Sequence, residues 1–307
     1  MPDLVTARNL TVTYPKRSEP ALRDASIRLE AGHVHVLLGR NGAGKSTLMH
    51  ALLGLLSPTS GTVEPASGIR LGWCAQRLVI DWFLGVWDNV LLGARLRGLA
   101  GPAAREAAQD ALDAVGLGEK AKLGPEELSG GEQQRLMVAR TLAYAPDVYV
   151  LDEPFVGLDV VVREGLMGLL RERASAGAAI LVSSHELSVL ERDVHDVTLI
   201  DAGRVVFDGG CEGFLERFVP LDTVTVTLRR PCDKGELRLL GVPARRVGES
   251  SFELRVRRGA PIGELLSRAA ALGELLDVAR DSPTLDDAVR AAYGDGAALR
   301  RPGSDRP

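Results

Sequence analysis

A compact apolar stretch, residues 34–38, leads straight into a glycine-rich loop that ends in lysine, serine and threonine. The loop reads Gly39-Arg40-Asn41-Gly42-Ala43-Gly44-Lys45-Ser46-Thr47, and a helical pattern over residues 46–56 follows it. Strand, glycine-rich loop and helix in this order form the context of a phosphate-binding loop. Backbone N–H groups of such a loop surround a phosphate at a helix N-terminus, where the helix dipole favours an anion. The sequence therefore predicts an α/β fold in which one strand of a sheet ends at a phosphate site.

Further strand-like stretches alternate with helical ones along the chain. Apolar stretches of this kind lie at residues 148–151, 179–182 and 197–200, and alternating ones lie at residues 4–14 and 22–30. Residues 90–115 have an alanine-rich helical pattern that is interrupted at Gly101-Pro102. Because apolar strands that alternate with helices form parallel sheets with helices on both faces, we expect a mainly parallel core sheet.

A second motif carries more information about family than the first. It reads Leu128-Ser129-Gly130-Gly131-Glu132-Gln133-Gln134-Arg135. Its serine and glycines open a helical pattern that continues to Arg140, so they form a second helix N-terminus suited to an anion. A phosphate-binding loop followed downstream by Leu-Ser-Gly-Gly is typical of one family. The chain resembles the ATP-binding subunit of ABC transporters, from about residue 3 to about residue 218.

The resemblance implies the domain organisation of the larger part of the chain. Residues 3–218 would form an ABC-type ATP-binding domain, a P-loop NTPase with an antiparallel β-subdomain and a helical subdomain beside the core sheet. After Phe218 the pattern becomes β-α-β-β-α-β-α, which suggests a small ferredoxin-like α/β accessory domain over residues 219–293. Residues 294–307, rich in Gly, Arg, Asp and Pro, are predicted to be a disordered tail.

Residues that match the family's motifs are expected to bind ATP and Mg²⁺. Lys45 would contact the β- and γ-phosphates. The other loop residues expected at the nucleotide are Gly39, Asn41, Gly42, Gly44, Ser46 and Thr47. The expected Mg²⁺ ligands are Ser46, Asp152 and Gln76. Asp152 ends an apolar strand, so its carboxylate should emerge at the carboxyl edge of the sheet, beside the phosphate loop.

The resemblance also implies catalytic and base-stacking residues. Glu153 resembles the glutamate that polarises the attacking water, a role that contributes about 10²–10⁴-fold in rate. His185 resembles the switch histidine that contacts the γ-phosphate, and Gln76 resembles the glutamine that senses Mg²⁺ and water. Tyr14 resembles the aromatic residue that stacks on adenine, although a tyrosine at a strand end is often only packing.

The phosphate loop and the Leu-Ser-Gly-Gly motif each supply half of a nucleotide site, and in the family the two halves come from different subunits, which implies a dimer. In the family, the helix that begins at Ser129, Gly130 and Gly131 faces a γ-phosphate held by a second subunit. Asp159 resembles the aspartate that touches the opposing subunit. The expected partners are therefore a second ATP-binding subunit, paired head to tail around two ATP molecules, and a separate integral membrane permease. The expected location is cytoplasmic, at the inner face of the cell membrane.

Composition excludes several other classes of protein. The chain has 307 residues, 45% of them hydrophobic, which is enough for packed cores. It contains no apolar run of eighteen residues or more and starts without a signal-peptide pattern, so we expect a soluble protein. Three scattered cysteines fit reduced thiols. A net charge of −4 argues against a nucleic-acid binder.

Two local features allow more than one interpretation. His33 and His35 alternate like a metal-binding pair, but two side chains on one face of a solvent-exposed strand is the simpler explanation. Three tryptophans, Trp73, Trp82 and Trp87, lie close together with Phe83. They pack inside the helical subdomain or serve as anchors for a membrane subunit, and the sequence favours neither alternative.

The predicted function is ATP hydrolysis that drives transport through the permease. The accessory segment and its end, Ser282-Pro283-Thr284-Leu285-Asp286-Asp287, resemble those of exporters of drugs, antibiotics or polysaccharides. The alternative is a soluble ABC-type ATPase that acts on ribosomes or DNA, although such proteins normally carry two ATP-binding domains or long coiled coils. A switch that binds ATP without turnover fits less well, because Glu153 and His185 are both present.

Overall fold

The computed structural model describes residues 2–15, 18–184, 187, 190–231 and 234–294. Packing divides the chain into an N-terminal unit, residues 1–211, and a C-terminal unit, residues 212–307. The division falls at the start of helix α6 (Cys211–Phe218), a little before the boundary at residues 218 and 219 that the sequence predicts. None of the helices among the described residues is both long and apolar enough to cross a membrane.

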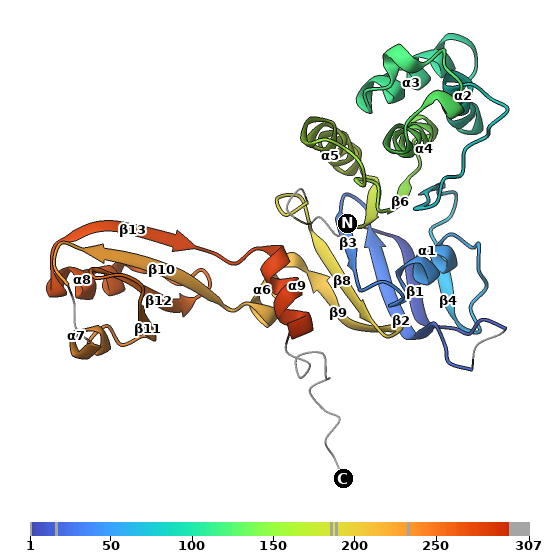
Figure 1. Ribbon diagram of the computed structural model, residues 1–307. Coiled ribbons are helices and arrows are strands. Elements are labelled where there is room, and N and C mark those ends of the chain that lie inside the picture. The colour runs from blue at the N-terminus through green and yellow to red at the C-terminus, as the bar shows by residue number, and fades with distance from the viewer. Residues whose placement is uncertain (1, 16–17, 185–186, 188–189, 232–233, 295–307) are drawn as a thin grey trace. The chain divides into compact units, whose positions relative to one another are not determined.

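The core of the N-terminal unit is a six-stranded sheet (Figure 1). Its strands, in spatial order, are β5 (Leu71–Cys74), β6 (Val148–Asp152), β7 (Ala179–Ser183), β3 (Val34–Leu38), β8 (Asp196–Asp201) and β9 (Arg204–Gly210). All neighbours are parallel except β8 and β9. Every residue of β3, β6 and β7 is buried, as expected for strands covered on both faces. The prediction of a mainly parallel core sheet is confirmed.

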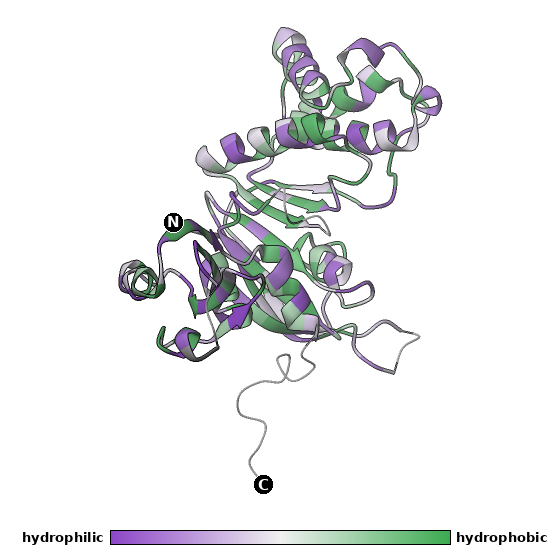
Figure 2. Ribbon diagram, turned by 60° about the vertical axis from the view of Figure 1, so that its left-hand side comes forward, coloured by the Kyte–Doolittle hydropathy of each residue, from purple (hydrophilic) through white to green (hydrophobic). Residues whose placement is uncertain are grey.

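A second sheet packs with helix α1 against the core. It is antiparallel, in the order β2 (Leu22–Glu30), β1 (Asp3–Val12) and β4 (Ser60–Pro65). Apolar residues of β1, β2 and α1 (Lys45–Leu52) share one cluster with residues of β3, β6 and β7. Figure 2 shows these apolar residues as green bands along the strands. Helix α1 ends before residue 56, contrary to the sequence prediction, because Gly54 adopts a left-handed φ of +70°.

Helices α2 (Val86–Leu96), α3 (Gly101–Ala114) and α4 (Gly130–Tyr144) pack on one another and form the helical subdomain. The helical pattern predicted over residues 90–115, with its break at Gly101-Pro102, corresponds to two helices, α2 and α3. Gly101-Pro102 begins α3, because proline is tolerated in the first turn, where its missing N–H costs nothing. On the core, α4 packs on β5 and α5 (Val160–Ser175) packs on β7.

The C-terminal unit contains a four-stranded antiparallel sheet. Its order is β11 (Ala244–Arg246), β12 (Ser251–Arg257), β10 (Leu221–Leu228) and β13 (Leu275–Asp281). Helices α7 (Lys234–Arg238), α8 (Gly263–Leu272) and α9 (Leu285–Gly294) complete the order β-α-β-β-α-β-α. Apolar residues from α7 and α8 and alternate residues of β10 and β12 form its own core. This arrangement fits the ferredoxin-like sandwich suggested by the sequence. Apart from Gly294, the predicted tail lies outside the described residues.

Candidate active site

A cavity of about 580 Å³ lies in the N-terminal unit where β3 and β6 end. This is the carboxyl edge of the sheet, where open α/β folds bind ligands. The loop before α1, the ends of β1 and β5, and the end of β6 all contribute to its wall. The lining residues are Tyr14, Ala21, Arg40, Asn41, Gly42, Gly44, Lys45, Ser46, Thr47, Gln76, Asp152 and Glu153. The structure therefore brings together most of the residues predicted for ATP and Mg²⁺.

The glycine-rich loop is shaped by a backbone that other residues would strain. Gly44 has φ of +114°, and a Cβ there would lie 2.9 Å from the Ala21 carbonyl oxygen. The loop passes close to β8 as well, because a Cβ on Gly39 would lie 2.8 Å from the Ile200 carbonyl oxygen. Glycine is needed at Gly44 both for its dihedral angle and for this close approach. Helix α1 begins immediately after it and directs its N-terminus at the cavity.

The Lys45 ammonium group lies folded back over the loop. Its Nζ donates hydrogen bonds to the carbonyl oxygens of Gly39 at 2.6 Å and Arg40 at 3.4 Å. Burial lowers the pKa of Lys45, and the nearby carboxylates of Glu153 and Asp152 oppose this shift. A half-buried cation close to carbonyl and carboxylate groups is well placed to meet a phosphate.

The hydroxyl and carboxylate predicted to bind Mg²⁺ are hydrogen-bonded to each other. Ser46 Oγ donates to Asp152 Oδ2 at 3.0 Å, and the Asp152 side chain is buried. A hydroxyl oxygen and a carboxylate oxygen, side by side next to a phosphate loop, are the hard ligands that Mg²⁺ prefers. The residues present therefore fit the ion. Gln76 lines the same cavity and is exposed to solvent.

Glu153 also lines the cavity and lies directly after β6. Only 5% of it is exposed, and its backbone adopts a left-handed φ of +54°. Its N–H group donates to Ser183, to the carbonyl oxygen at 3.2 Å and to Oγ at 3.0 Å. The Tyr14 hydroxyl lies 3.2 Å from Thr47 Oγ1. The sequence alone gave no signal that Ser183 belongs to this site.

The other predicted residues lie away from this cavity. Ser129 caps α4, where its Oγ accepts the Glu132 N–H group, and Gly130 and Gly131 form the first turn. Asp159 caps α5 and accepts the Val162 N–H group at 2.9 Å. None of these residues lines the cavity of the described chain. His185 lies outside the described residues.

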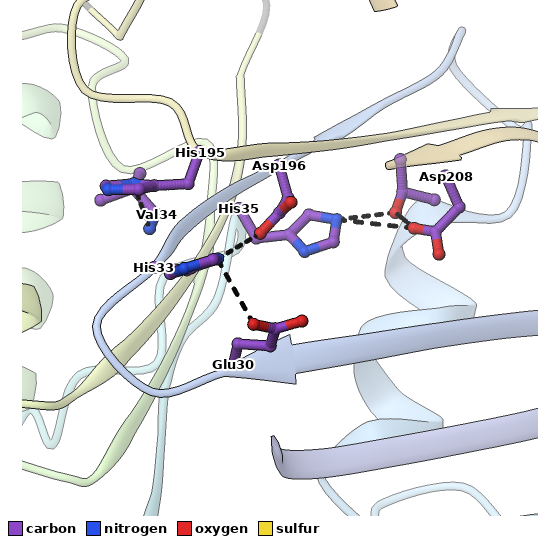
Figure 3. Close-up of polar contacts among 8 residues, drawn as sticks. Glu30, His33, Val34, His35, His195, Asp196 and Asp208 are labelled. Atoms are coloured by element: carbon purple, nitrogen blue, oxygen red, sulfur yellow. Dashed lines mark hydrogen bonds and ion pairs between the residues drawn. The ribbon is translucent and has the colours of Figure 1, made fainter. Parts of the chain in front are cut away.

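A group of polar contacts around β3 corrects the interpretation of the two histidines (Figure 3). His35 is not on a solvent-exposed face: it is 4% exposed, because β3 is an inner strand, and burial lowers its pKa. Its Nε2 lies 2.7 Å from Thr198 Oγ1. His33 Nδ1 instead lies 2.6 Å from Asp196 Oδ2, and its ring stacks on His195. Among the described residues no group of three or more His, Cys, Asp or Glu is arranged for a metal ion.

The aromatic residues near β5 divide into two groups. Trp73 is half-buried against the N-terminal core, with its ring 5.2 Å from that of His50, and Trp87 is also half-buried. Trp82 is 50% exposed and Phe83 is fully exposed. Trp73 therefore packs internally, and Trp82 and Phe83 lie on the surface.

Comparisons with known proteins agree with this geometry. The family described as ABC transporter matches residues 22–156. The zinc transport system ATP-binding protein TroB of Treponema pallidum (strain Nichols) is 36% identical over 228 residues, 70% of this chain and 85% of that protein. The manganese transport system ATP-binding protein MntB of Bacillus subtilis (strain 168) is 36% identical over 211 residues, which are 65% of this chain and 84% of that protein.

A solved relative has the same fold over the N-terminal unit. The ATP-binding cassette MJ0796, in a dimeric post-hydrolysis state bound to ADP and Pi, superimposes with a TM-score of 0.62 at 26% identity. The match covers 67% of this chain and 98% of the cassette. Motif, cavity, fold and relatives lead to one conclusion: the chain belongs to the family of ABC transporter ATP-binding proteins, which are ATPases that bind ATP with Mg²⁺.

Proposed function

We propose that the cavity is the ATP site of a head-to-tail dimer, which drives import of a divalent metal ion through a separate membrane permease. The observation that carries the site assignment is the meeting of Lys45, Ser46, Asp152 and Glu153 in one cavity at the carboxyl edge of the sheet.

Each of these side chains has one task in the proposed reaction. Lys45 holds the β- and γ-phosphates, while Ser46 and Asp152 hold Mg²⁺. The ion, when bound, neutralises charge on the phosphates. Glu153 orients and polarises the attacking water from its buried position behind the loop. Tyr14, which lines the same cavity, stacks on adenine. Phosphoryl transfer needs little more than this positioning and charge neutralisation.

A dimer is proposed because the cavity of one chain lacks the second motif. Ser129 lies at the N-terminus of α4, away from the cavity, so the helix end of a second copy is needed to contact the γ-phosphate. Three exposed valines flank Asp159, namely Val156, Val160 and Val161. Apolar side chains with this much exposure suit a surface that a second copy covers. Solved relatives described as dimeric support the same arrangement.

The permease is proposed to bind the exposed apolar segment between β5 and α2. Leu78, Val79, Trp82 and Phe83 are 42%, 50%, 50% and 100% exposed. Four apolar side chains on one short segment, next to Gln76, form a surface that water does not favour. Exposed aromatic anchors of this kind dominate the binding energy of interfaces.

The names of several relatives support the proposed direction and cargo. Several proteins similar to this chain are named for zinc or manganese transport, and some of these are zinc import proteins, such as ZnuC of Alcanivorax borkumensis at 40% identity over 195 residues. They give no support to the exporter subtype predicted from the accessory segment. An action on ribosomes or DNA is not favoured either. We therefore place zinc or manganese import ahead of drug or polysaccharide export.

The cargo is tested in cells that lack the gene. Cellular zinc or manganese, measured by mass spectrometry in metal-poor medium, should fall and return when the wild-type gene is restored. The Glu153→Gln gene should not restore it. A rise of either metal in cells that lack the gene would indicate export rather than import. Unchanged levels of both metals would reject this cargo.

The permease contact is tested by affinity purification from detergent-solubilised membranes. Trp82→Ala and Phe83→Ala should each reduce recovery of a polytopic partner, because truncating an anchor costs about 2 kcal/mol. Leu55→Ala, at an apolar residue that is 59% exposed elsewhere on the unit, is the matched control. If Trp82→Ala and Phe83→Ala recover as much partner as Leu55→Ala, the segment is not the docking surface.

A further inference from the structure

Ser183 joins the two acidic residues of the active site through one hydroxyl group. It is the last residue of β7 and pairs in register with Asp152, the last residue of β6. Its Oγ donates to Asp152 Oδ1 at 2.5 Å and accepts the Glu153 N–H group at 3.0 Å. The side chain is fully buried, so water does not compete for either hydrogen bond.

The hydroxyl fixes which oxygen of Asp152 is available at the cavity. A serine hydroxyl has one proton, and here that proton goes to Oδ1. The other oxygen, Oδ2, accepts from Ser46 Oγ at 3.0 Å. The carboxylate is thus held at both ends and cannot rotate freely. Asp152 Oδ2 therefore stays directed at the Ser46 hydroxyl, and these two groups are the proposed Mg²⁺ ligands.

The same hydroxyl holds the backbone of Glu153 in an unusual conformation. A non-glycine residue with φ of +54° persists only where its surroundings over-determine it. The Glu153 N–H group is bound by both Oγ and the carbonyl oxygen of Ser183. These bonds fix the point at which the chain turns away from β6, and therefore the start of the Glu153 side chain.

We propose that Ser183 is a positioning residue for the ATPase reaction: its hydroxyl orients the Asp152 carboxylate toward the metal and sets the backbone of Glu153. Ser183 itself does not line the cavity. The inference rests on the roles proposed above for Asp152 and Glu153.

The test compares Ser183→Ala with a control that removes another buried hydroxyl. Thr198→Ala serves as the control, because Thr198 is also fully buried on a core strand but bonds to His35 and Asp208 instead. Mn²⁺ binding to the full chain with a non-hydrolysable ATP analogue is measured by electron paramagnetic resonance. Affinity for the same analogue is measured in EDTA, and kcat and KM are measured for Mg-ATP.

Ser183→Ala should weaken Mn²⁺ binding and lower kcat by about tenfold or more, as expected when a partner of a metal-binding carboxylate is removed. Analogue affinity in EDTA should stay within about twofold of wild type, because the phosphate loop is untouched. Thr198→Ala should leave Mn²⁺ affinity unchanged. Ser183→Thr, which keeps the hydroxyl, should retain the wild-type Mn²⁺ affinity and kcat.

Ser183→Cys keeps the size of the side chain and replaces the hydroxyl by a weak donor, so it provides a folded variant if alanine is not tolerated. It should lose Mn²⁺ affinity in the same way. Unchanged Mn²⁺ affinity and kcat in Ser183→Ala or Ser183→Cys would overturn the inference, as would an equal loss in Thr198→Ala. Glu153→Gln and Asp152→Asn are measured in parallel. If those two variants keep wild-type turnover, the proposed roles of the acidic residues fail instead.

Discussion

At the scale of single residues, the active site combines burial with opposite charges that hold one another in place. Lys45 has a pKa lowered by burial, yet it remains close to two carboxylates and two carbonyl oxygens. This arrangement leaves a fixed cation at the loop before any phosphate arrives. A preorganised charge needs little rearrangement when the substrate binds, which is the usual source of electrostatic catalysis.

Replacing Lys45 by alanine tests this point. Loss of a charged hydrogen bond to phosphate costs about 1.5–3 kcal/mol, so ATP affinity should fall roughly tenfold to a hundredfold. Turnover should fall with it. Isothermal titration with a non-hydrolysable analogue measures the affinity, and Lys122→Ala, at an exposed lysine outside the cavity, is the control. Near wild-type binding in Lys45→Ala would reject the assignment of the phosphate site.

At the scale of elements, helix α4 begins with a reciprocal cap. Glu132 Oε2 accepts the Ser129 N–H group at 3.0 Å, and Ser129 Oγ accepts the Glu132 N–H group. Lys120 donates to Glu132 Oε1 at 2.6 Å. These bonds rigidify the helix end that is proposed to face the nucleotide of a second copy. The cap thus serves stability and also presents the motif.

Because of this cap, the free energy of unfolding should depend on pH. The hydrogen bond from Lys120, together with that from the Ser129 backbone, lowers the pKa of Glu132 from 4.5 to about 2. Ionised Glu132 therefore stabilises the fold fully above about pH 4.5, and this contribution is lost as pH falls toward 2. Glu132→Gln should lower the free energy of unfolding by roughly 1 kcal/mol at pH 7, with solvent screening taken into account.

Urea unfolding of wild type and Glu132→Gln at pH 7, 4 and 3 measures the difference. The difference in free energy of unfolding between the two proteins should become smaller as pH falls. Glu119→Gln, at an exposed glutamate in the same region, should show no such dependence. A gap that is constant across the three pH values would exclude this contribution of Glu132.

At the scale of the whole molecule, every residue predicted for ATP and Mg²⁺ belongs to the N-terminal unit. Helix α6 belongs to the C-terminal unit, where Arg258 Nε donates to Glu212 Oε2 at 3.4 Å. Phe214 and Leu215 of α6 are buried. The accessory unit has a core of its own, so each unit has the interior that independent folding requires.

Two truncations test this division. Residues 1–211 should form a soluble, cooperatively folding unit that binds ATP. Residues 1–219 should bind ATP as well, because every residue that lines the cavity lies at or before Glu153. Thermal unfolding and size-exclusion chromatography compare the two. An insoluble 1–211 chain would mean that the C-terminal unit completes the main core.

The dimer gives a second prediction at this scale. Glu153→Gln removes the carboxylate that polarises water but leaves Ser46 and Asp152 in place, so ATP should bind without being cleaved. Light scattering during size-exclusion chromatography should show a monomer without nucleotide and a dimer with ATP and Mg²⁺. Adding Ser129→Arg should abolish the dimer, because the bulky side chain would occupy the position of the other copy's phosphate. A dimer that survives Ser129→Arg would contradict the sandwich arrangement.

Features of this protein that depend on local order along the chain could be predicted from the residues alone. The phosphate loop needs glycines at fixed spacing between a strand and a helix, and this pattern can be read without a structure. The alternation of strands and helices predicted the parallel sheet, and the change after Phe218 predicted a second unit. The site residues could be named because they match the motifs of the family that the chain resembles.

Contacts between strands that are distant in sequence could be seen only in the folded chain. The register between β6 and β7 places Ser183 against Asp152, and the strand order buries His35. Packing against α1 and the core separates Trp73 from exposed Trp82. A residue type indicates whether a side chain can donate, ionise or avoid water. Which partner it meets depends on strand register and layer packing, and these are set by the whole core rather than by neighbours along the chain.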